Sequence, residues 1–197
     1  RAGEAGGAMI LLIDLCYRDG SLSRDEFVRP VERLLREAGA QFTTRHYAVL
    51  SAPEIEAADA VVLCGTALQD TGFAGHPERF SWLPLFERPV LGISSGMRVL
   101  SSAFGGGTEP CCEIGMTDVH VLAPDPLFAE KETFPAYEVH EYAVLVPDRF
   151  IPLAASERCI QAIRHRSLPL YGLLFHPEVR NEWVVERFLR RVETARW

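Results

Sequence analysis

The chain has 197 residues, of which 48% are hydrophobic and 24% are charged. This composition is typical of a globular protein and excludes a disordered, collagen-like or coiled-coil chain. Twenty basic residues against 27 acidic ones give a formal net charge of −7, which argues against nonspecific binding to nucleic acid or to a membrane surface. The length favours one domain over two. We expect residues 1–8, rich in Gly and Ala, to be a tag remnant or flexible extension, and residues 9–197 to form a single domain.

The first half of the chain alternates predicted strands with predicted helices. Residues 9–14 form a continuous apolar run, which is typical of a parallel strand buried on both faces. Residues 23–26 have the form of a capping box, and the helical spacing of the apolar residues that follow predicts a helix ending at Gly39. Further strands are predicted at 41–46, 60–64 and 89–93. This alternation indicates an α/β protein with a doubly wound, mostly parallel sheet and helices on both faces.

The second half of the chain has a different pattern. After the glycines at 105–107, short apolar segments are separated by Pro, Asp and Gly turns, which predicts an added antiparallel or mixed region. Residues 182–192 have apolar side chains at helical spacing and predict a closing amphipathic helix. The strands of this half are predicted at 119–122, 137–140, 142–146, 160–164 and 170–175.

The cysteines bear on the compartment, and the length of the apolar runs bears on membrane-spanning segments. The five cysteines form no Cys-x-x-Cys pair and have no regular zinc spacing, so we expect a reducing, cytoplasmic location and no metal. No stretch of 18 apolar residues occurs, so we expect no membrane-spanning segment. The cysteines are Cys16, Cys64, Cys111, Cys112 and Cys159.

Ser94 is the first candidate catalytic residue. The strand at 89–93 stops at small residues and then continues into a predicted helix, which is the pattern of a nucleophile elbow. In such a turn the Ser94 side chain stands above the sheet, and the amide of Ser95 at the helix N-terminus offers positive potential to an oxyanion. The alternative is a tight strand-to-helix turn without chemistry.

His176 and Glu178 are the second candidate pair. They follow the predicted strand at 170–175, where His176 could act as a general base and Glu178 could fix its tautomer. The same tripeptide, His-Pro-Glu, occurs at 76–78 in a loop with no strand before it. The tripeptide alone is therefore a weak signal, and the preceding strand is what favours His176. Two strand ends of one parallel sheet can bring Ser94 and His176 together.

In their order and spacing, these segments resemble the class I glutamine amidotransferases from Met9 to about Arg191. Order and spacing together are far more specific than any one motif. The resemblance implies a flavodoxin-like doubly wound sheet with an added antiparallel or mixed region. The matching features are an apolar first strand ending in Asp14, Gly65 after the third strand, Gly-Ile-Ser-Ser-Gly-Met at the elbow, Glu113-Ile-Gly115, Asp125-Pro-Leu-Phe128, the His of Tyr-Glu-Val-His140, and Leu-Phe-His-Pro-Glu178.

The resemblance implies a role for each matching catalytic residue. Ser94 occupies the position of the nucleophile, which in the family is the Cys of Gly-Ile-Cys-x-Gly. None of the five cysteines takes its place. His176 and Glu178 align with the base and the orienting acid of the triad. Gly65 and the amide of Ser95 align with the oxyanion hole.

Substrate binding is implied at two further positions. Arg98 stands near the place where the family often has a Gln that helps to hold the substrate, and it could bind a carboxylate or point to solvent. His140 aligns with a position near the substrate pocket, although a single His in a strand is often structural. The chain also departs from the family after Gly65, where Thr66 and Ala67 replace the usual second glycine.

Serine at position 94 has a chemical consequence. A thiol has a reference pKa of about 8.5 and is readily deprotonated by a neighbouring His, whereas a hydroxyl must lose its proton during attack. A Ser in a site built for Cys should therefore be slow. Three explanations stay open: an engineered replacement of Cys, a natural relative that has lost glutaminase activity, or a genuine Ser hydrolase.

The function implied by the resemblance is hydrolysis of the glutamine side-chain amide, with the ammonia passed to a separate synthase subunit. We expect this activity to be weak or absent with Ser94, and we expect no cofactor. Because the chain ends at Trp197, we expect no fused synthetase domain. The alternatives are a non-catalytic binding or regulatory module on the same fold, or a Ser-dependent hydrolase of another γ-glutamyl or small amide substrate.

Overall fold

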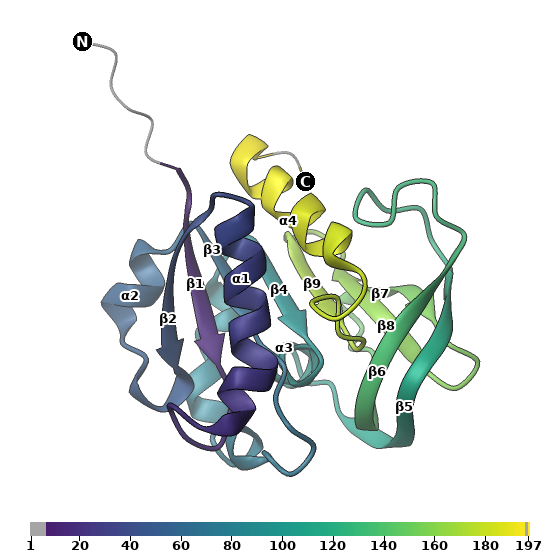
Figure 1. Ribbon diagram of the computed structural model, residues 1–197, viewed down its shortest axis with the longest axis horizontal. Coiled ribbons are helices and arrows are strands. Elements are labelled where there is room, and N and C mark those ends of the chain that lie inside the picture. Colours follow the sequence, from purple (N-terminus) through teal and green to yellow (C-terminus); the bar gives the residue numbers. More distant parts are fainter. Residues whose placement is uncertain (1–6, 196) are drawn as a thin grey trace.

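A computed structural model describes residues 7–195 and 197, so most of the predicted 1–8 extension lies outside the described residues. The described chain forms a nine-stranded mixed sheet in the order β2-β1-β3-β4-β9-β8-β7-β5-β6 (Figure 1). The strands are β1 Met9–Asp14, β2 Gln41–His46, β3 Ala60–Leu63, β4 Val90–Ile93, β5 Thr108–Val121, β6 Thr133–Val144, β7 Phe150–Ala155, β8 Ile160–His165 and β9 Leu170–Leu173. The α-helices are α1 Arg29–Glu37, α2 Ala52–Ala57, α3 Ser95–Ala103 and α4 Glu182–Thr194.

The parallel half of the sheet has the strand order 2-1-3-4 followed by β9, which is the flavodoxin-like order. Strands β2, β1, β3, β4 and β9 all pair in parallel. Beyond β9, the strands β8, β7, β5 and β6 pair antiparallel. The predicted fold class, a doubly wound sheet with an added antiparallel region, is therefore confirmed.

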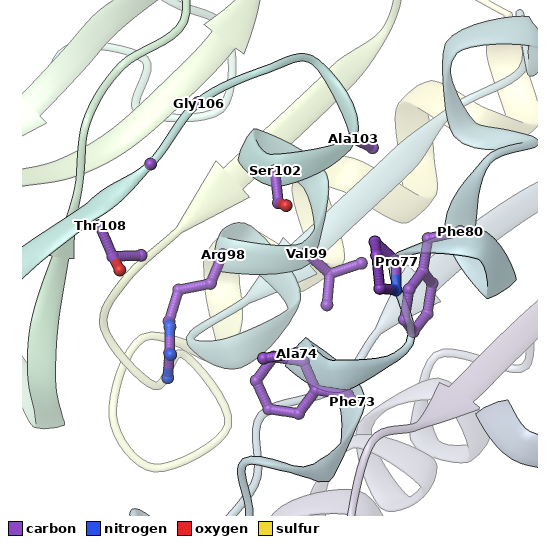
Figure 2. Close-up of a pocket in the computed structure, with 11 residues that line it drawn as sticks. Phe73, Ala74, Pro77, Phe80, Arg98, Val99, Ser102, Ala103, Gly106 and Thr108 are labelled. Atoms are coloured by element: carbon purple, nitrogen blue, oxygen red, sulfur yellow. The ribbon is translucent and has the colours of Figure 1, made fainter.

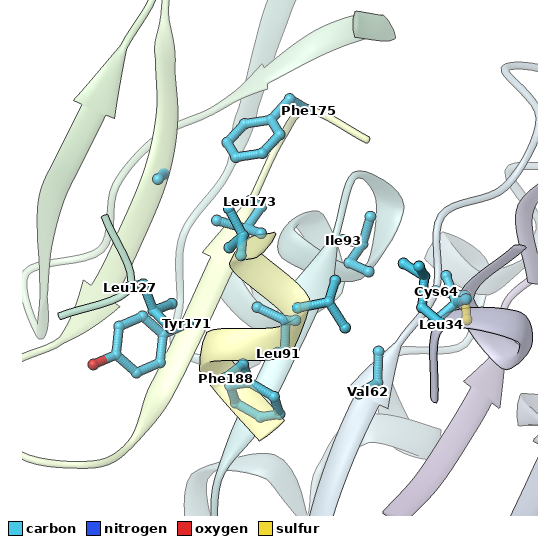
Figure 3. Close-up of a cluster of buried hydrophobic side chains, with 14 of the residues drawn as sticks. Leu34, Val62, Cys64, Leu91, Ile93, Leu127, Tyr171, Leu173, Phe175 and Phe188 are labelled. Carbon is cyan, nitrogen blue, oxygen red and sulfur yellow. The ribbon is translucent and has the colours of Figure 1, made fainter. Parts of the chain in front are cut away.

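Helices cover both faces of the parallel half (Figure 1). α1 and α4 share one apolar core with the sheet, and α3 packs into a second core on the opposite face. In Figure 3, Leu91 of β4 and Tyr171 of β9 lie beside Phe188 of α4 in the first of these cores. Among the described residues, no helix has the length and apolar character needed to cross a bilayer. This packing leaves the carboxyl ends of β3, β4 and β9 as the place where polar side chains meet.

Several local predictions differ from the structure. The Ser23 side chain makes no capping hydrogen bond among the described residues, and a π-helical turn at Arg24–Val28 precedes α1. The segments predicted separately at 137–140 and 142–146 belong to one strand, β6, which ends at Val144. Strand β7 was not predicted, because Pro152 interrupts its sequence; the pairing with β8 is irregular just after this residue.

Candidate active site

Ser94 lies in a strained turn between β4 and α3. Its backbone has φ 50° and ψ −107°, which costs a non-glycine residue about 1–3 kcal/mol. Its N–H donates a 2.6 Å hydrogen bond to the carbonyl of Leu173 in β9. Gly96 allows α3 to begin close to β3, because a Cβ atom there would lie 2.2 Å from the carbonyl oxygen of Leu63. The predicted elbow is thus present, held between β3 and β9.

His176 and Glu178 form a buried pair just after β9. The Nδ1 atom of His176 lies 2.7 Å from Oε1 of Glu178, and each side chain is only 1% exposed. Because a carboxylate can only accept, Nδ1 donates in this contact, and in the neutral imidazole this tautomer places the lone pair on Nε2. The ring centres of Phe27 and His176 lie 5.5 Å apart, and the backbone N–H of His176 donates to the carbonyl of Tyr137. Nε2 has no hydrogen-bond partner in the described part of the chain, which leaves it available as a base.

Gly65 brings the two strand ends together. A Cβ atom at this position would lie 2.8 Å from Cε1 of His176 and 3.3 Å from Cβ of Ser94. Only glycine therefore fits between the imidazole and the elbow. Ser95 is the first residue of α3, so its N–H has no acceptor within the helix. The structure thus assembles Ser94, His176 and Gly65, as the sequence predicts, with Ser95 beside them in the chain.

The cavity beside Ser94 is small. Its volume is about 10 Å³, which is roughly the space that a single water needs. Bound glutamine would therefore require neighbouring side chains to move. The lining residues come from the loop after β3, from α3 and from β6: Thr66, Ala67, Leu68, Ser94, Ser95, Arg98, Val139, His140, Glu141 and Tyr142.

Arg98 separates this cavity from a larger one. Its guanidinium lies 5.5 Å from the ring centre of Phe73 and 5.2 Å from that of Tyr142. Its Nε atom is buried without a hydrogen-bond partner among residues 7–195 and 197, and burial lowers its pKa. Figure 2 shows the side chains of Arg98 and Val99 extending from α3 into the larger cavity, with Phe73 nearby; this cavity has a volume of about 180 Å³. Arg98 is thus stacked between two aromatic rings at the edge of the site.

His140 belongs to a buried polar cluster behind the cavity. Its Nδ1 lies 2.9 Å from the carbonyl oxygen of Cys111, and its Nε2 lies 3.4 Å from Glu113 and 3.5 Å from Glu138. Burial lowers the pKa of His140. Burial and the neighbouring charge of Glu113 raise the pKa of Glu138 to about 8. The ring nitrogens of His140 therefore face this cluster.

Sequence reasoning missed Tyr142 and Glu138 as neighbours of the site. Tyr142 follows His140 by two positions on β6, so the period-two alternation of a strand could have placed it on the same face. Glu138 precedes His140 by two positions and shares this signal. The pairing of His140 with Glu113 across β5 and β6 has no such local signal.

Comparison with known proteins shows which family the chain matches. The sequence profile of the family described as "Glutamine amidotransferase class-I" matches residues 23–191. The chain belongs to the class I glutamine amidotransferases. Within this family, it is 37% identical over 100 residues to one subunit of the glutamine-hydrolysing GMP synthase of Methanopyrus kandleri, a match that covers 48% of this chain and 54% of the relative. The corresponding GMP synthase subunit of Pyrococcus abyssi is 36% identical over 110 residues, covering 53% and 58%.

Solved structures with the same fold superpose on nearly the whole chain. A protein of Thermoplasma acidophilum, provisionally assigned as the corresponding GMP synthase subunit, superposes with a TM-score of 0.85 at 22% identity, covering 96% of both chains. A glutamine amidotransferase of Thermotoga maritima gives a TM-score of 0.71 at 20% identity, covering 95% of this chain and 83% of the other. The sequence matches span only about half the length of the curated relatives. At 20–22% identity, the superpositions show a likeness in fold and nothing more.

Proposed function

We propose that this amidotransferase binds glutamine at Ser94 and hydrolyses its side-chain amide slowly, supplying ammonia to a separate synthase subunit. The relatives that it matches are named as subunits of glutamine-hydrolysing GMP synthases. A second subunit that uses the ammonia is therefore the natural partner to test.

The observation that carries this proposal is the His176–Glu178 pair. A binding module needs neither a strained elbow at Ser94 nor a buried imidazole next to this elbow. Both features carry a cost in stability, since the elbow backbone is unfavourable and Nε2 is buried without a partner among the described residues. Retention of both supports a site shaped for proton transfer.

The chemistry assigns one step to each residue. The Oγ atom of Ser94 attacks the amide carbon while Nε2 of His176 takes its proton, and the N–H groups of Gly65 and Ser95 stabilise the oxyanion. His176 then donates this proton to the amide nitrogen as the C–N bond breaks, so ammonia leaves and a γ-glutamyl ester of Ser94 remains. Water hydrolyses this ester, which releases glutamate and restores the Ser94 hydroxyl. Glu178 orients His176 and stabilises its cationic form.

Arg98 and His140 are proposed as residues of the substrate pocket. Arg98 presents a guanidinium that lacks an acidic partner among the salt bridges of the described chain, so it can bind the α-carboxylate of an amino acid. His140 lines the pocket, but its ring nitrogens face the polar cluster. Its proposed role is therefore to form part of the pocket wall. Entry of the substrate requires Arg98 and Tyr142 to separate.

The test compares the chain that carries Ser94 with Ser94→Cys and Ser94→Ala by ammonia release from glutamine, alone and with a candidate synthase subunit. We expect Ser94→Cys to exceed the Ser94 chain by about 10²-fold or more, because a His-paired thiol ionises readily. Ser94→Ala should be inactive and reports background. If Ser94→Cys releases no ammonia in either setting, the glutaminase proposal is wrong.

The cavity of about 10 Å³ favours a second candidate, a non-catalytic binding or regulatory module. In that case Ser94→Cys stays inactive although the protein is folded. Labelling of Ser94 by a fluorophosphonate, without ammonia release from glutamine, would support a third candidate, a Ser-dependent hydrolase of another γ-glutamyl or small amide substrate. Such labelling should disappear in Ser94→Ala.

A further inference from the structure

The polar cluster behind the active site contains a group of metal-binding side chains. The ligand atoms of Cys111, Glu113 and Cys159 all lie within 4.8 Å of one another. They come from β5 and from the turn between β7 and β8. The sequence shows no regular zinc spacing because these residues are far apart in the chain and only the fold brings them together.

A β-bulge contributes to this arrangement. Along β5 the pairing passes from Pro110 to Glu113, while along β6 it passes only from Tyr142 to His140. One extra residue on β5 is therefore accommodated at this point, and a bulge of this kind re-aims the neighbouring side chains. Glu113 lies directly opposite His140 in this register.

His140 gives an independent indication of a cation. Its Nδ1 donates to the carbonyl of Cys111 at 2.9 Å, which leaves a lone pair on Nε2. This lone pair faces Glu113 at 3.4 Å and Glu138 at 3.5 Å, and His140 is only 3% exposed. Neither Nε2 nor either carboxyl oxygen of Glu138 has a hydrogen-bond partner among the residues described. A lone pair that faces two carboxyl groups requires a proton or a metal ion between them.

We propose that Cys111, Glu113 and Cys159 bind a structural zinc ion and that the imidazole of His140, which lies outside their 4.8 Å group but 3.4 Å from Glu113, moves towards the ion as the fourth ligand. Two thiolates, a carboxylate and an imidazole match the ligand types that Zn²⁺ prefers, and four protein ligands close the coordination sphere. The side chains of Ser156 and Gln161 donate to Glu113 at 3.0 Å and 2.9 Å and hold its carboxylate in place.

Access and position agree with a structural role. The two cysteines are only partly buried, so a metal ion can reach them from solvent. The site would join β5, β6 and the β7–β8 turn, and its His140 ligand also lines the cavity at Ser94. Metal binding would thereby brace the wall of that cavity, whatever reaction Ser94 supports.

The experiment uses the full chain, reduced and freed of metal with a chelator, and titrates it with Zn²⁺ and with Co²⁺ as a spectroscopic probe. We expect one metal per chain and a thiolate-to-cobalt charge-transfer band with the visible bands of tetrahedral coordination. Cys111→Ser and Cys159→Ser should each weaken binding by about 10²-fold or more. Cys112→Ser is the matched control, because Cys112 is adjacent but exposed and outside the cluster.

A second measurement needs no variant. Zn²⁺ should protect Cys111 and Cys159 of the wild-type chain from maleimide, while Cys112 reacts at an unchanged rate. The proposal is overturned if the wild type binds no stoichiometric metal, if Cys111→Ser binds as tightly as the wild type, or if Cys112→Ser weakens binding equally. In the first case a proton, and not a metal, lies between His140 and the glutamates.

Discussion

The chain contains the tripeptide His-Pro-Glu twice, and the two copies have different environments. In both, Nδ1 of the His faces Oε1 of the Glu, at 3.2 Å for His76 and Glu78 and at 2.7 Å for His176 and Glu178. The first pair is 55% and 67% exposed, whereas each member of the second is 1% exposed. The local sequence therefore specifies the contact, and the surrounding strands decide whether it can support chemistry.

Removing the glutamate carboxylate from each pair should give the largest difference in glutamine hydrolysis between the two copies. In a Ser94→Cys background, we expect Glu178→Gln to lower the rate of glutamine hydrolysis by about 10²-fold or more, because the His176 tautomer and its cationic form lose their partner. Glu78→Gln is the matched control and should leave the rate unchanged. Ammonia release measures both. Equal rates for the two variants would contradict the assignment of Glu178.

Filling the space beside each His should have the next largest effect. Gly65→Ala places a Cβ atom 2.8 Å from the His176 ring, so we expect a loss of activity of about 10²-fold in the same background. Thermal unfolding should report a stability loss of ~1–3 kcal/mol.

Gly75→Ala is the control for this steric effect. It lies next to His76, and apart from its two chain neighbours an added Cβ there meets no atom of the described chain within 4 Å. We expect its stability and activity to match those of the parent. If Gly65→Ala also leaves stability and activity unchanged, this result contradicts the close approach of Gly65 to His176.

Burial also predicts an effect on the pH dependence of stability. The pKa of Glu138 is raised from 4.5 to about 8, so the folded protein keeps a proton that the unfolded chain releases above pH 4.5. The stabilisation is complete below the unfolded pKa and is lost as the pH rises through about 8. In metal-free protein, Glu138→Gln should resemble the wild type near pH 4 and exceed its stability by ~2–4 kcal/mol at pH 9.

Denaturant unfolding at several pH values measures this difference. Glu141→Gln is the control, since Glu141 lies on the same strand but is exposed. It should follow the wild-type pH dependence. A constant offset between Glu138→Gln and the wild type across this range would contradict the buried proton.

The parts of the fold that could be predicted from sequence depend on local patterns. The apolar runs of β1 and β4, the small residues at the elbow and the spacing in α4 each lie within about a dozen positions. The β7 strand was missed because Pro152 is unusual in a strand, and β6 was divided because its exposed Glu141 interrupts the apolar pattern.

The close approach of Ser94 and His176 could be predicted because each follows a recognisable strand. The polar cluster could not, because the pairing of Glu113 with His140 depends on a bulge and on long-range register. The size of the cavity at Ser94 likewise depends on how Arg98 stacks between Phe73 and Tyr142, which no local pattern specifies.

The parallel pairing of β4 with β9 has a consequence for folding. Val90 lies opposite Leu170, eighty positions further along the chain, and β5 to β8 lie between these two strands in sequence. Closing so long a loop is slow compared with forming local contacts. During synthesis, about 4–16 s separate the two strands at 5–20 residues per second. Ser94 and His176 are therefore brought together late, and we expect the proposed site to be among the last parts of the structure that the folding chain completes.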